Sequence, residues 1–127
     1  MVIISVSINE EMLKEMERLQ RELGFSGRSE LIRASVRMLI ADNKEIEKLE
    51  GRLSSVLLLI HNQKDEDIVT EIKHKFEDII NTHVHNHLKE DRCLEVFVLD
   101  GDAVRIKHLT KLFQACGKME YVKLIIA

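Results

Sequence analysis

The sequence predicts an α+β fold in two domains, a smaller one over residues 1–50 and a larger one over residues 51–127. Three observations lead to this prediction. Residues 2–8 alternate between apolar and other side chains, as a strand does, and two stretches with helical spacing follow them. Beyond Gly51, short apolar runs typical of strands alternate with helical patterns. A chain of 127 residues can hold two such cores only if each is small.

The first domain is predicted to contain one strand and two helices. Residues 2–8 form the strand, with apolar side chains at the even positions. Asn9 suits the N-cap of a helix over residues 10–23, which Gly24 ends. A second helix begins near Ser29 and continues through a charged stretch to Gly51.

The second domain is predicted to follow the order β-α-β-β-α-β. Its strands are expected at residues 53–60, 82–88, 93–99 and 121–126, and its helices at 66–80 and 103–116. Residues 100–102, Asp-Gly-Asp, are expected to form a turn before the second helix. This order is the split βαβ, ferredoxin-like arrangement.

Composition excludes several functional classes. The net charge of -3, from 19 basic and 22 acidic residues, gives no general attraction for nucleic acid, so any DNA binding must depend on local features. No apolar run approaches the roughly 18 residues of a membrane span. Two cysteines without a secretory leader lead us to expect a reducing, cytoplasmic location. Without a nucleophile–base arrangement, P-loop or dinucleotide motif, we do not expect an enzyme.

The first domain needs a partner, because its single strand has none within residues 1–50. We expect two copies to pair their strands antiparallel beneath four helices. Ile3, Ser5 and Ser7 then project outward on a two-stranded ribbon that fits a DNA major groove. Arg28 and Ser29 open the second helix, where free backbone N–H groups suit a phosphate.

Residues 24–33, Gly-Phe-Ser-Gly-Arg-Ser-Glu-Leu-Ile-Arg, resemble the ribbon-helix-helix DNA-binding domain. The resemblance implies a double-stranded DNA operator as partner. One departure concerns Ile3, since regulators of this type often carry a basic residue early in the strand. The alternative interpretation is a unit that only dimerises.

Histidines dominate the predicted strand at residues 82–88. His83, His85 and His87 alternate, so a strand places all three on one face. In the following strand the apolar face, predicted to pack on the helices, is formed by Leu94, Val96 and Val98.

Cys93 has the opposite parity and is expected to join the histidines on the sheet face away from the helices, covered by another subunit. Imidazole and thiolate ligands suit Ni²⁺, Zn²⁺ or Cu²⁺. Two further histidines, His61 and His108, are expected on the surface.

The whole arrangement is similar to the NikR family of nickel-responsive regulators, in which a ribbon-helix-helix domain precedes an ACT-like domain. The resemblance is carried by the His-x-His pattern before the Cys-Leu-Glu start of a strand. It implies nickel at a tetramer interface, bound by His-x-His and Cys of one chain and a helix histidine of another. Matched by the His-x-His-x5-Cys spacing, the ligands are His85, His87, Cys93 and His74. Matched by the local string His-Val-His, His83 is an alternative or additional ligand.

The resulting hypothesis is a nickel-responsive repressor of nickel uptake genes, assembled as a dimer of dimers. Two alternatives stay open. One is a metal-binding sensor or storage protein without DNA binding. The other is a repressor that responds to Zn²⁺, Cu²⁺ or a small amino acid at the ACT-like interface.

Overall fold

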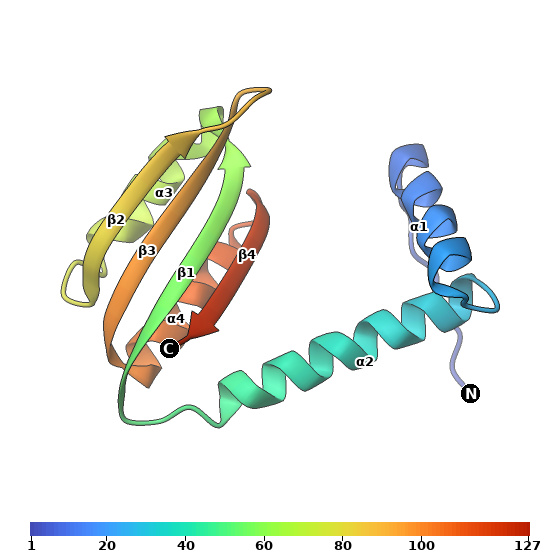
Figure 1. The fold of residues 1–127 in the computed structure, drawn as a ribbon, viewed down its shortest axis with the longest axis horizontal. Helices are drawn as coiled ribbons and strands as arrows, with labels where there is room; N and C mark the ends of the chain where they lie inside the picture. The colour runs from blue at the N-terminus through green and yellow to red at the C-terminus, as the bar shows by residue number, and fades with distance from the viewer. The chain divides into compact units, whose positions relative to one another are not determined.

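A computed structural model describes all residues 1–127 and divides them into two units, Met1–Lys48 and Leu49–Ala127. The two helices of the first unit and the β-α-β-β-α-β elements of the second follow the predicted order (Figure 1). The elements are α1 (Glu10–Leu23), α2 (Arg28–Glu47), β1 (Arg52–Asn62), a short 3-10 turn (Gln63–Asp65), α3 (Glu66–His74), β2 (Ile80–His87), β3 (Arg92–Asp102), α4 (Ala103–Ala115) and β4 (Met119–Ile126). None of the helices combines the length and apolar character needed to cross a bilayer.

Local signals in the sequence set the ends of α1. The Asn9 side chain accepts a hydrogen bond from the Met12 amide at 2.8 Å, which caps the helix start. Gly24 ends the helix with φ of 77°, a left-handed conformation that costs glycine little. The Phe25 amide then bonds back to the Gln20 carbonyl at 3.0 Å. These contacts confirm the helix expected over residues 10–23.

Residues 1–9 form no strand, in contrast to the prediction for residues 2–8. A strand requires hydrogen bonds to a neighbour, and the chain offers this segment no edge to pair with. Its apolar side chains are accordingly exposed, as are many on the two helices, and Leu31 is the only buried residue of the first unit. The unit therefore lacks a core of its own.

The second unit is a four-stranded antiparallel sheet in the order β2-β3-β1-β4. Both helices, α3 and α4, cover the same face of the sheet (Figure 1). The core between them is formed by Leu57, Leu59, Val69, Ile72, Phe76, Ile79, Phe97, Leu99, Ile106, Leu109, Phe113 and Leu124. The edge position of β2 leaves its outer side without a neighbouring strand.

Two element boundaries differ from the prediction. The helix expected over residues 66–80 ends at His74, and a series of tight turns brings Phe76 and Ile79 into the core without a helix. The turn expected at residues 100–102 is the end of β3, because Gly101 pairs with Leu53 in the ladder and the Asp102 side chain caps α4.

The opposite face of the sheet carries aliphatic side chains and no helix. Along β1 and β3 the strictly alternating burial assigns half-buried residues to this outer face: Val56, Leu58, Ile60, Leu94, Val96 and Val98. Val84 on β2 and Ile125 on β4 are exposed large hydrophobics in register with them. A contiguous apolar surface such as this aliphatic outer face is typical of an interaction surface.

A short connection, residues 48–51, joins α2 to β1. The Leu49 carbonyl accepts a hydrogen bond from Lys107 Nζ at 2.7 Å, and the Gly51 carbonyl accepts one from the Ala103 amide at 2.8 Å. The beginning of α4 thus holds the second half of the connection in place.

Candidate metal centre

The pairing of β2 with β3 decides which side chains meet. His87 lies opposite Cys93, His85 opposite Glu95, and His83 opposite Phe97. Directly opposed residues of an antiparallel pair project to the same side of the sheet. Since Phe97 belongs to the core, the histidines and Cys93 lie on the helix-covered side.

This placement corrects the prediction that the cluster lies on the face away from the helices. Leu94, Val96 and Val98 are apolar, but so are Phe97 and Leu99 of the opposite parity, so apolar content alone did not identify the inward side of β3. The larger side chains pack under α3 and α4, and they bring Cys93 inward with them. Apolar residues, not ligands, occupy the outer face.

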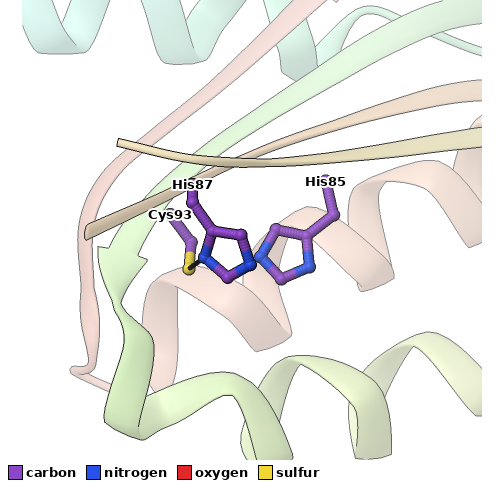
Figure 2. A group of neighbouring side chains, drawn as sticks. All are labelled: His85, His87 and Cys93. Atoms are coloured by element: carbon purple, nitrogen blue, oxygen red, sulfur yellow. Dashed lines mark hydrogen bonds between the residues drawn. The ribbon is translucent and has the colours of Figure 1, made fainter. Parts of the chain in front are cut away.

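Three predicted ligands converge at one end of the β2–β3 pair. One ligand atom each from His85, His87 and Cys93 lies within 4.8 Å of the others (Figure 2). The Cys93 Sγ–His87 Nδ1 distance is 3.8 Å, and the ring centroids of His85 and His87 are 4.9 Å apart. Cys93 is fully buried, whereas both histidines are exposed on the edge strand. Two imidazoles and a thiol form a donor set that fits Ni²⁺.

The surroundings of Cys93 keep its thiol protonated. Burial raises the pKa of Cys93, and the nearby Glu66 and Glu95 carboxylates raise it further. A thiol is a metal ligand only as thiolate, so a cation that binds here must displace its proton.

His61, Glu66 and Glu95 extend the site, although the sequence reasoning gave none of them a role. His61 and Glu95 are fully buried and hydrogen-bond to each other through His61 Nε2 and Glu95 Oε2. Glu66 Oε2 lies 3.3 Å from His61 Nε2 and 3.6 Å from His85 Nε2. Burial raises the pKa of Glu66, and the neighbouring Glu95 carboxylate adds to this effect.

The prediction that His61 is a surface residue is therefore wrong. Its parity along β1, shared with Leu57 and Leu59, was the signal that could have placed it inside.

His83 and His74 lie apart from the three converged ligands. His83 Nε2 hydrogen-bonds to Glu95 Oε1 at 2.7 Å, and its ring stacks on Phe97 with centroids 4.3 Å apart. His74 is exposed at the end of α3, where its Nδ1 lies 2.6 Å from Glu77 Oε1. Within one chain, His74 belongs to no cluster of candidate ligands.

The residues predicted to contact DNA all lie in the first unit. Ile3, Ser5 and Ser7 are exposed in the segment before α1, and Ser29 is exposed in the first turn of α2. Arg28 begins α2 and forms an ion pair with Glu17 of α1, with 2.8 Å between Nη2 and Oε1. That ion pair is half exposed, so its guanidinium stays accessible to a phosphate.

Comparisons with known proteins give a consistent result for both units. Residues 54–127 match the family "NikR C terminal nickel binding domain", and residues 2–43 match "Ribbon-helix-helix protein, copG family". Relatives named "Putative nickel-responsive regulator" are 37% identical in Methanocaldococcus jannaschii and 34% identical in Methanococcus maripaludis. Both alignments cover 97% of this chain and 89% of the relative.

A solved structure of an uncharacterized protein from Thermotoga maritima is similar in fold, with a TM-score of 0.55 and 20% identity. The match covers 60% of this chain and 98% of that one, and it bears on the fold alone.

The two units define a class of protein, a transcription regulator with a helical domain of a DNA-binding family ahead of a metal-binding domain. Within that class, the chain belongs to the NikR family of nickel-responsive regulators.

Proposed function

We propose that this protein is a cytoplasmic, nickel-dependent repressor that binds the operators of nickel uptake genes. The observation that carries the proposal is the convergence of His85, His87 and Cys93 within 4.8 Å in a NikR-family chain. A ribbon-helix-helix unit in the same chain supplies the connection to DNA.

The proposed nickel ligands are His85, His87 and Cys93 of one chain and His74 of another. Thiolate and imidazole donors support Ni²⁺ here, with Zn²⁺ and Cu²⁺ as competitors. His74 is exposed and outside the cluster of its own chain, which suits a ligand given to a second copy. The hydrogen bond from His83 to Glu95 favours His87 over His83 as the ligand.

Two surfaces support a tetramer built as a dimer of dimers. The exposed apolar side chains of residues 2–8 are suited to pairing with the same segment of a second copy. The aliphatic outer face of the sheet, defined above, suits contact between metal-binding units. Ile3, Ser5, Ser7, Arg28 and Ser29 are the proposed DNA contacts.

Nickel would act in this assembly as a ligand that binds one arrangement of the DNA-binding units better than others. Such a ligand shifts the population toward that arrangement in proportion to its differential affinity. The affinity of the assembled protein for DNA should also fall steeply with salt, since phosphate contacts release counterions.

The test is a gel shift of the full-length protein on DNA from upstream of its own gene, with and without Ni²⁺. We expect a shift that requires nickel and is lost in Cys93→Ala. Cys116→Ala is the matched control, because Cys116 is a second free cysteine whose Sγ bonds only to the Phe113 carbonyl. Nickel binding without any DNA shift would contradict the repressor and favour the sensor or storage alternative.

The metal itself is identified by absorption spectroscopy. A thiolate-to-nickel band that disappears in Cys93→Ala supports nickel at this site. Tighter binding of Zn²⁺ or Cu²⁺ than of Ni²⁺ in competition would favour a regulator that responds to another metal.

A further inference from the structure

The segment proposed to enter the DNA groove offers no charged side chain to the bases. Residues 1–9 contain no Lys, Arg, Asp or Glu. In the proposed pairing with a second copy, the outward positions are Ile3, Ser5 and Ser7. None of these can make the bidentate contact by which Arg or Lys recognises guanine. Direct readout of the bases by this segment must therefore come from one aliphatic side chain and two hydroxyls.

The two serines leave the choice of base open. A hydroxyl group both donates and accepts hydrogen bonds, so Ser5 and Ser7 can each bond to either kind of base pair. Ile3 has no polar side-chain atom, and it contributes to binding only where it covers apolar surface. The apolar group that a base edge presents in the major groove is the C5-methyl group of thymine.

Ile3 also discriminates against the other bases. Guanine, adenine and cytosine present ring nitrogens, carbonyl oxygens or amino groups at the same edge. An isoleucine placed over them would remove water from these polar groups without giving them a hydrogen-bond partner, which costs free energy. The same side chain thus favours thymine and disfavours its alternatives.

The structure gives Ile3 no role in packing within the chain. Its side chain is 89% exposed, and Leu31 is the only buried residue of the first unit. Ile4, Val6 and Ile8 have the even parity that suits packing against helices once two copies pair, so Ile3 stays on the opposite face. A large aliphatic side chain on that face needs apolar surface from outside the protein.

From these observations we infer that Ile3 is a specificity-determining residue that packs on a thymine methyl group in the operator. The inference rests on the proposed function, because it names the base that the proposed DNA-contacting face selects. Residues on one face of a strand repeat about every 6.8 Å, which is close to two base-pair steps of about 3.4 Å. Ile3, Ser5 and Ser7 therefore meet different base pairs, and the contribution of Ile3 can be measured by itself.

The test replaces thymine by uracil, which pairs identically and lacks only the methyl group. DNA from upstream of the gene is amplified with either thymine or uracil nucleotides, and its affinity for the full-length protein with Ni²⁺ is measured by fluorescence anisotropy. We expect about 10-fold weaker binding to the uracil DNA, since one buried methyl group contributes about 4-fold and a paired ribbon carries two copies of Ile3.

Variants at Ile3 assign this sensitivity to its side chain. Ile3→Ser should bind thymine DNA about 10-fold more weakly and lose most of the difference between the two DNAs, because the methyl contact is already absent. Ile3→Val retains branched methyl groups and should retain the difference. Ser7→Ala is the matched control on the same face, and it should lower affinity for both DNAs while leaving their ratio unchanged.

Salt dependence separates this contact from phosphate binding. Ile3→Ser should leave the slope of log affinity against log salt concentration unchanged, whereas Arg28→Ala should reduce it by about one or more. Equal affinity of the unmodified protein for thymine and uracil DNA, or a full difference that persists in Ile3→Ser, would overturn the inference and leave the proposed function intact. Failure of the unmodified protein to bind thymine DNA at all would contradict both.

Discussion

Cys93 connects burial to the pH dependence of metal binding. Because burial and two carboxylates raise its pKa, the thiol is protonated at pH 7.5 and must release its proton to bind a metal. Nickel affinity should therefore rise by about 10-fold between pH 7.5 and 8.5.

Chelator competition at the two pH values measures this change. Cys93→Ala removes the titrating thiol and should make the residual affinity nearly flat over the same interval. Affinity of the unmodified protein that is equal at both values would refute the role assigned to this thiol.

Gly101 is a residue whose lack of a side chain is required by packing. A Cβ atom at this position would lie 2.5 Å from Cγ2 of the buried Ile79. Gly101→Ala should therefore lower the free energy of unfolding by about 1–3 kcal/mol through overpacking. Urea denaturation measures the effect, and combining it with Ile79→Ala should cost less than the sum of the two single changes.

At the scale of elements, Arg105 on α4 holds the turn between α3 and β2. Its Nη2 donates to the Lys75 carbonyl at 2.9 Å and to Asp78 Oδ1 at 2.6 Å, and its guanidinium lies 4.2 Å from the Phe76 ring centroid. Arg105→Ala should destabilise the protein by about 1 kcal/mol, mainly through the lost contact with the buried ring. Thermal denaturation measures this, with Lys111→Ala on the exposed side of α4 as control.

The stabilising effect of the Arg105–Asp78 ion pair depends on pH in a defined direction. The hydrogen bond from Arg105 lowers the pKa of Asp78, so the ionised carboxylate is favoured in the folded state. Its stabilising effect is complete above the unfolded pKa near 3.9 and disappears as the pH falls through the lower folded value. The difference between the unmodified protein and Asp78→Asn should accordingly shrink below about pH 4.

Helix starts and helix faces could be predicted because local chemistry encodes them. The Asn9 cap and Gly24 define α1, and both lie beside the residues that they control. The end of α3 could not be predicted in the same way, because Phe76 and Ile79 keep an apolar spacing while the backbone turns. The predicted order of elements in the second unit is still correct, because it does not depend on where each helix ends.

The convergence of His85, His87 and Cys93 could be predicted from the sequence, whereas the surroundings of this cluster could not. The spacing of His85, His87 and Cys93 brings them together in any antiparallel β2–β3 pair of this register. The side of the sheet that they occupy depends on how α3 and α4 pack on the strands. That packing joins parts of the chain that are distant in the sequence. Glu66 and Glu95 were missed for the same reason, because their approach requires that packing.

At the scale of the whole molecule, residues 2–8 have two faces in the proposed pairing with a second copy, and these faces should separate assembly from DNA recognition. Ile4→Lys places a charge on the apolar face and should reduce the size of the assembly. Ser5→Ala alters the outward face and should keep the assembly while weakening specific DNA binding by about 5-fold, as for one lost hydrogen bond. Sedimentation and fluorescence anisotropy measure the two properties. A smaller assembly in Ser5→Ala would contradict the assignment of faces.

The hydrogen-bonded connection at residues 48–51 has a consequence for the avidity of the proposed assembly for DNA. Leu49 and Gly51 are both hydrogen-bonded to α4, so the connection between α2 and β1 is short. A short, stiff tether gives a high effective concentration for a second binding event when its span matches the target, and almost none when it does not. Under the proposed function, the assembly should therefore bind half-sites at one separation along the duplex and bind the same half-sites more weakly when they are moved by a few base pairs.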